Sequence, residues 1–145
     1  MSLLVFKLGS MNKFLAGYLA AVFVIVALDV LWLGLIAKAM YRQAIGHLMA
    51  EQPRLLAALA FYVLYAAGLM IFAVMPHADE PAWGKTVLMG ALFGFFAYAT
   101  YDLSNLATLR NWPVGLTLVD MAWGALLSAA AAAAGKAALS WAAKA

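Results

Sequence analysis

Four long apolar segments dominate this sequence, and each is bounded by basic or polar residues. About 20 apolar residues are enough to cross the hydrocarbon core of a bilayer as an α-helix. Lipid offers the backbone no hydrogen-bond partners, so each segment must pair its own amide groups, as a helix does. The sequence therefore predicts an all-α polytopic membrane protein, a four-helix antiparallel bundle. Its transmembrane helices are predicted at residues 14–37, 55–75, 86–108 and 114–135.

The composition agrees with a membrane protein of one domain. Of the 145 residues, 68% are hydrophobic and 10% are charged, whereas a soluble domain carries about 25% charged residues. Met11 opens a segment that resembles a natural bacterial start. We therefore interpret residues 1–10 as a vector-derived or disordered leader and residues 11–145 as a single transmembrane domain.

Several classes of site are not expected in this chain. It has no cysteine, which excludes disulfides, thiolate catalysis and zinc–thiolate sites. His47 and His77 both fall between apolar segments, so we expect no haem inside the bilayer, and the cofactor, if there is one, is unknown. The net charge of +3 is small and its basic residues are scattered, so no nucleic-acid partner is expected.

The connections predict how the helices are arranged. Residues 109–113 form a very short link, which forces the third and fourth helices into an antiparallel hairpin. Gly90 and Gly94 give the third helix a face of small residues, which we expect to pack within the chain, although a homo-oligomer stays open. Basic residues are equally numerous at the two ends, so the positive-inside rule does not decide the orientation. We expect a multi-pass protein of the bacterial inner membrane with both termini cytoplasmic, as is usual for small bacterial membrane proteins.

Three aspartates are the only charged residues inside the predicted helices: Asp29, Asp102 and Asp120. At ~1.5 Å per residue, each lies roughly 10–12 Å below the same membrane face. A carboxylate at membrane depth costs on the order of 2.5–3.5 kcal/mol, so three of them at one depth require partners. We expect them to form one cluster facing the bundle interior.

Other polar and aromatic residues are predicted at the same depth. Trp32 and Trp123 each follow an aspartate by one helical turn, so they should form two walls of one pocket. The remaining candidates are hydrogen-bond donors of the second and third helices, and we expect at least two of them to bond an aspartate directly or through water. They are Tyr62, Tyr65, Tyr98, Tyr101 and Asn105.

Three arginines lie at the predicted pocket mouth: Arg42, Arg54 and Arg110. Contact with lipid headgroups and a role in topology explain such residues in most membrane proteins. A sharper interpretation is recognition of a phosphate or carboxylate headgroup. The spacing of the acidic residues matches no metal motif.

Three stretches carry a resemblance to a known family. They are Leu28–Gly34 (LDVLWLG), Tyr98–Pro113 (YATYDLSNLATLRNWP) and Val119–Gly124 (VDMAWG). On these motifs the chain resembles DUF2177, a family of predicted bacterial membrane proteins, from Met11 to about Gly135. The family has no assigned function, so the resemblance implies the four-helix architecture and transfers no catalytic role.

The acidic cluster supports three hypotheses. In the first, the pocket binds or transports a small amphipathic or lipid-like ligand, with or without proton coupling, and membrane lipids are its partners. In the second, the protein is an enzyme acting on lipid, with aspartates as general acid and base or as ligands of a divalent cation. In the third, the aspartates form a structural network that fixes helix packing or receives a partner helix. Three acids in one layer favour a functional pocket over a purely structural one.

Overall fold

Four helical segments are long and apolar enough to cross a membrane, as the sequence predicts: Met11–Ile36, Leu55–His77, Gly84–Thr108 and Val114–Ala142. The computed structural model describes residues 2–144, and the side chains of residues 11–144. Met1 and the side chains of the rest of the leader fall outside that description, so the origin of residues 1–10 stays a prediction. The elements in chain order are α1 (Ser2–Leu31), the π-helix η1 (Trp32–Ile36), α2 (Lys38–Ile45), the 3-10 helix η2 (Gly46–Leu48), α3 (Leu55–Leu69), the π-helix η3 (Met70–Val74), the 3-10 helix η4 (Met75–His77), α4 (Gly84–Thr108) and α5 (Val114–Ala142).

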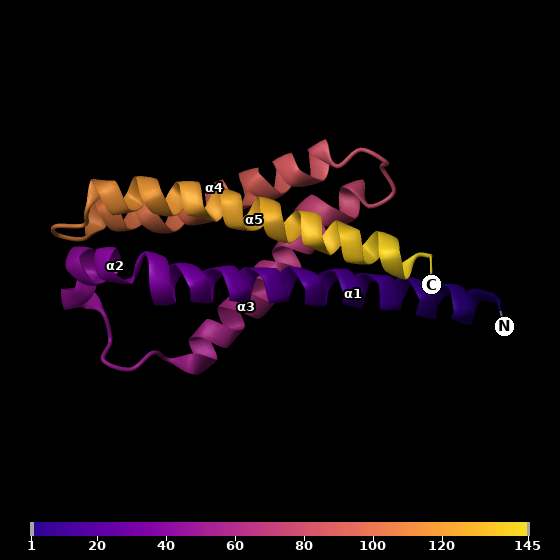
Figure 1. Cartoon of the computed structure of the whole chain (residues 1–145), viewed down its shortest axis with the longest axis horizontal. Helices are drawn as coiled ribbons and strands as arrows, with labels where there is room; N and C mark the ends of the chain where they lie inside the picture. The colour runs from indigo at the N-terminus through magenta and orange to yellow at the C-terminus, as the bar shows by residue number, and fades with distance from the viewer. Residues whose placement is uncertain (1, 145) are drawn as a thin grey trace.

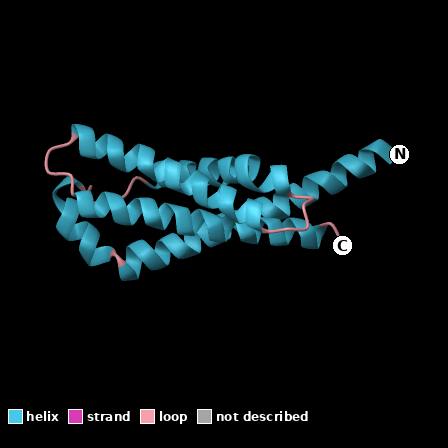
Figure 2. Cartoon of the chain, turned by 90° about the horizontal axis from the view of Figure 1, so that it is seen from above, coloured by secondary structure: helices cyan, strands magenta, loops and turns pink. Residues whose placement is uncertain are grey.

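The helices alternate in direction around α5. In Figure 1, α4 and α5 run side by side, α1 packs along α5, and α3 crosses α1 diagonally. Both termini and the α3–α4 connection lie at one end, whereas α2 and the α4–α5 turn lie at the other. Figure 2 shows the same arrangement from above, with the N-terminal part of α1 extending beyond the other helices. The antiparallel four-helix arrangement is therefore confirmed.

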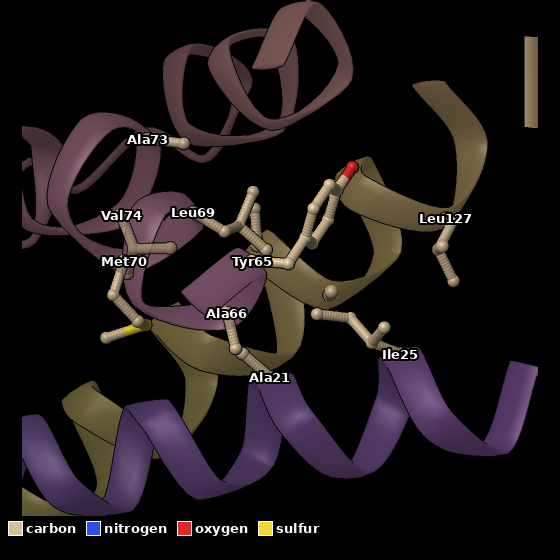
Figure 3. Close-up of a cluster of buried hydrophobic side chains, with 11 residues drawn as sticks. Ala21, Ile25, Tyr65, Ala66, Leu69, Met70, Ala73, Val74 and Leu127 are labelled. Atoms are coloured by element: carbon tan, nitrogen blue, oxygen red, sulfur yellow. The ribbon is translucent and has the colours of Figure 1, made fainter. Parts of the chain in front are cut away.

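The hydrophobic core lies where α3 crosses the bundle (Figure 3). Ala21 and Ile25 of α1 meet Ala66 and Leu69 of α3, and Leu127 of α5 closes the other side. All five are fully buried. Ile25 precedes Asp29 by one turn, so this packed apolar region lies on the terminal side of the aspartates.

Glycines allow α4 and α5 to approach closely. A Cβ atom added at Gly90 would lie 2.6 Å from the Cβ atom of Ala132, and one added at Gly94 would overlap the carbonyl oxygen of Gly124. The small-residue face of the third helix therefore packs inside the chain, as expected.

The last helix continues beyond the predicted end at residue 135. Lys136 lies inside α5 and is almost fully buried. Its ammonium group donates hydrogen bonds to the carbonyl oxygens of His77, at 2.8 Å, and Ala82, at 3.0 Å. It also donates to the Thr86 hydroxyl at 3.3 Å. Because these oxygens accept hydrogen bonds from the ammonium group of Lys136, α5 can continue past this buried charge.

The close approach of α4 and α5 predicts opposite effects for two identical substitutions. Gly94→Ala should lower the free energy of unfolding by about 1–3 kcal/mol, because the added methyl group overlaps α5. Gly115→Ala is the control, since nothing lies within 4 Å of its added Cβ atom, and alanine should leave the helix as stable or more stable. Thermal unfolding in detergent measures both. Equal midpoints for the two variants would show that the contact is looser than the structure has it.

Candidate functional site

The three aspartates come from three different helices, and all three are buried, as expected. Their side chains are 4% exposed at Asp29, 0% at Asp102 and 4% at Asp120. Asp120 lies close enough to both of the others to interact with them electrostatically. We call these three residues the acidic layer. It lies between the hydrophobic core and the end of the bundle that carries α2.

Two stacked tryptophans connect α1 and α5 at the acidic layer. The Trp32 and Trp123 rings lie 4.4 Å apart between centroids and are 8° from parallel. The indole N–H of Trp123 donates a hydrogen bond to Asp29 at 3.1 Å. The two residues therefore lie side by side next to Asp29, and such a pair contributes ~0.5–1.5 kcal/mol beyond its buried area. That they form walls of a ligand pocket stays a prediction.

A widened helical turn follows Asp29. Trp32 begins the π-helix η1, and its carbonyl oxygen accepts a hydrogen bond from the amide of Ala37 at 2.7 Å. A π-turn inserts one extra residue and rotates everything after it; such turns are frequent at functional sites. Here the rotated segment is α2, which carries Tyr41.

Tyr41 is a residue of the site that the sequence analysis did not select, because it lies between the first two predicted transmembrane helices. Its hydroxyl donates a hydrogen bond to the Asp120 carboxylate. Burial raises the pKa of Tyr41, and the hydrogen bond to Asp120 raises it further, so the hydroxyl keeps its proton at physiological pH. The spacing of Ala37, Tyr41 and Ile45 at every fourth position was the available signal, since it places all three on one face of a helix.

Asp102 differs from the other two aspartates. Among the described residues, neither of its carboxylate oxygens has a hydrogen-bond partner. Tyr101 is 56% exposed and packs edge-on against Trp112. Ser104 donates to the carbonyl oxygen of Tyr101 at 2.9 Å. The polar residues beside Asp102 in the sequence are therefore directed elsewhere.

The expected donors of the second and third helices have different partners, and a bond through water to the acidic layer stays a prediction for them. Tyr62 interacts with Asp29, whereas the Tyr65 hydroxyl pairs with Ser128 at 2.7 Å. Within the described chain, the other direct bonds to aspartates come from Trp123 and Tyr41. The depth argument considers only the position of each residue along its helix and not the direction of its side chain.

An aromatic cavity of about 420 Å³ lies between α3 and α4. It is within the size range of small-molecule sites. Its lining residues, which define the name "aromatic cavity" below, are Phe61, Tyr65, Ala97, Tyr98 and Tyr101. Leu55, Leu56 and Leu64 of α3 are strongly exposed, because the first half of this helix diverges from the bundle (Figure 1). Phe61 and Tyr101, which line the cavity, are themselves exposed, so the cavity opens on the side of the bundle between α3 and α4.

Tyr98 lies between the aromatic cavity and the acidic layer. A Cβ atom at Gly124 would overlap the Tyr98 ring, so the ring rests directly on α5. Tyr98 also interacts electrostatically with Asp29 and Asp120. The aromatic cavity therefore borders the acidic layer at Tyr98.

The three arginines are exposed, and they occupy different positions at the α2 end of the bundle. Arg42 lines a second cavity of about 240 Å³, together with Leu33, Lys38, Tyr41 and Met49. Arg54 precedes α3, and Arg110 lies in the α4–α5 turn. A headgroup-binding role stays a prediction for all three arginines.

The described residues contain no group of three or more histidine, cysteine or acidic side chains arranged to hold a metal ion. The acidic layer is therefore spread more widely than a site with three such ligands. A site in which two carboxylates hold a divalent cation stays a prediction.

Comparison with known proteins gives one match. A family model described as "Predicted membrane protein (DUF2177)" matches residues 14–137. No curated protein and no solved structure matches the chain.

The contact between Tyr41 and Asp120 predicts a measurable loss of stability. Tyr41→Phe keeps the ring but leaves a buried carboxylate without its donor, so the free energy of unfolding should fall by about 1–3 kcal/mol. Tyr101→Phe removes the same hydroxyl from an exposed position and should have almost no effect. Thermal unfolding of both variants in detergent tests this. Equal unfolding midpoints for Tyr41→Phe and Tyr101→Phe would show that the hydrogen bond to Asp120 does not hold α2 to the bundle.

Proposed function

The chain belongs to the DUF2177 family of predicted membrane proteins, and we propose that it binds or transports a small amphipathic, lipid-like ligand. The observation that carries this proposal is that Tyr98 lines the aromatic cavity and also interacts electrostatically with Asp29 and Asp120 of the buried acidic layer. One end of such a site suits an apolar chain, and the other end suits a polar head.

The lateral opening favours a ligand that arrives from the bilayer. The lining of the aromatic cavity consists of four aromatic residues and one alanine, which matches the apolar walls of ligand sites. Because α3 diverges from the bundle at this level, an acyl or isoprenoid chain can enter without unfolding a helix. An entirely water-soluble ligand would instead have to cross the end that carries α2.

The acidic layer supplies the polar end of the site. Asp29 and Asp120 accept hydrogen bonds from Trp123 and Tyr41, respectively, whereas Asp102 has no donor among the described residues. We further propose that the protein lies in the bacterial inner membrane with cytoplasmic termini, so that this end of the pocket lies in the outer half of the bilayer. Labelling of single cysteines at Asp79 and Asn111 from outside would test that orientation, because the chain has no native cysteine.

A membrane enzyme acting on lipid is the second candidate. Asp102 and Asp120 interact electrostatically, and a neighbouring pair of acids is the arrangement that general acid–base catalysis uses. Turnover of a lipid by wild type, abolished in Asp120→Asn, would favour this candidate. In the third candidate, an assembly factor, the open side of α3 and α4 would receive a partner helix.

The aromatic cavity predicts a saturable site for an apolar chain. A diazirine-bearing hexadecanol in nanodiscs should label Phe61 and Tyr65 in a way that excess hexadecanol suppresses. Ala97→Trp should reduce this labelling about tenfold, because the indole fills the cavity. Ala107→Trp, at an exposed position of the same helix, should leave it unchanged. Labelling that spreads evenly over the lipid-facing helices and ignores Ala97→Trp would refute the proposal.

In the proton-coupled version of this function, binding changes the protonation of the acidic layer. Asp102→Asn keeps the shape of the side chain and removes its titratable proton. Binding of the hexadecanol probe should then vary across about pH 5 to 8 in wild type and be flat in the variant. Identical profiles for the two proteins would contradict proton coupling at Asp102 and leave the binding proposal intact.

A further inference from the structure

Asp102 has an unusual environment for a carboxyl group in a membrane helix. It is completely buried, and the described residues provide no donor to either oxygen. A buried polar group without a partner is strongly disfavoured, and an unpaired buried charge more so. Since Asp29 and Asp120 both have donors from this chain, the missing donor at Asp102 points to something that the chain does not supply.

We propose that the ligand is a cationic amphiphile whose ammonium head donates hydrogen bonds to Asp102 while its apolar tail occupies the aromatic cavity. This inference rests on the proposed function and names its ligand class. A primary or secondary ammonium group fits better than a quaternary one, because unpaired carboxylate oxygens require N–H donors.

The charge around the site favours a cation. The acidic layer has three carboxyl groups. The buried lysine of this bundle, Lys136, is held by the α3–α4 connection at the opposite end. Lys38 and Arg42 line the separate cavity that Tyr41 also lines, and both side chains are exposed. An anionic head such as phosphate would therefore meet repulsion in a medium that screens charge poorly.

The geometry of α4 places Asp102, which would bind the ammonium head, near the aromatic cavity, which would hold the tail. Tyr98 lines the aromatic cavity and precedes Asp102 by four residues, so the two share a helix face about one turn apart. Aromatic faces also attract cations, so Tyr98 offers an ammonium group a favourable path past its ring. A single carboxylate is enough for an organic cation, whereas the described acidic residues do not gather in threes around a metal position.

The experiment compares amphiphiles that share one tail. Calorimetry on the protein in phosphatidylcholine nanodiscs, with empty nanodiscs subtracted, would measure binding of octylammonium, octanol and octyltrimethylammonium. Octylammonium should bind about tenfold more tightly than either of the others, which is the value of one charge-assisted hydrogen bond. Asp102→Asn should abolish that preference. Asp79→Asn makes the same change in the exposed α3–α4 connection and should preserve it.

The outcomes separate this inference from the function on which it rests. Equal, saturable and mutually competing binding of octylammonium and octanol would overturn the cationic head and keep the amphiphile pocket. No saturable binding of any probe would overturn both. A preference for octylammonium that persists in Asp102→Asn would show that Asp102 does not bind the ammonium head. If that variant fails to fold, the comparison in wild type decides, since octyltrimethylammonium lacks N–H donors and its equally tight binding would refute the hydrogen bond to Asp102.

Discussion

The close contact between α4 and α5 is the constraint on which the rest of the structure depends. Gly94 and Gly124 face each other, and a Cβ atom at either would overlap the opposite helix. Without those atoms the two backbones approach closely enough for Tyr98 to rest on α5. Because the hairpin turn is short, this contact also fixes which residues of the two helices are opposite one another, including Asp102 and Asp120.

The π-turn after Asp29 has a comparable role on the other side of α5. It begins at Trp32, whose ring stacks on Trp123, and it reorients α2 so that Tyr41 reaches Asp120. The end of the bundle is thereby closed by a segment of chain that does not cross the membrane. Asp29 and Asp120 are both paired as a result, and the contrast with Asp102 follows from the same geometry.

The bundle has two different halves. Toward the termini, α1, α3 and α5 meet in a packed apolar core, and Lys136 ties α5 to the α3–α4 connection. Toward α2, the first part of α3 diverges and leaves the aromatic cavity open to the side. One half holds the helices together, so the other half can keep buried acids and an open cavity. This division is a physical reason to look for function on the α2 side.

The sequence alone determined the four membrane helices, the common depth of Asp29, Asp102 and Asp120, and the packing face at Gly90 and Gly94. These follow from the constant rise of a helix and from the absence of water in lipid, which act on each segment separately. It also placed Trp32 and Trp123 together, because both follow an aspartate by one turn.

Only the tertiary structure decided which donor meets which acid. That choice depends on how far each helix is rotated about its own axis, and a π-turn changes the rotation by inserting one residue. The periodicity of the sequence does not specify such a turn. The contact of Tyr41 with Asp120 was therefore not predicted, and neither was the absence of a donor to Asp102 among the described residues. Depth is a property of one helix, whereas the hydrogen bonds that Tyr41 and Trp123 donate to the aspartates require two helices to face each other.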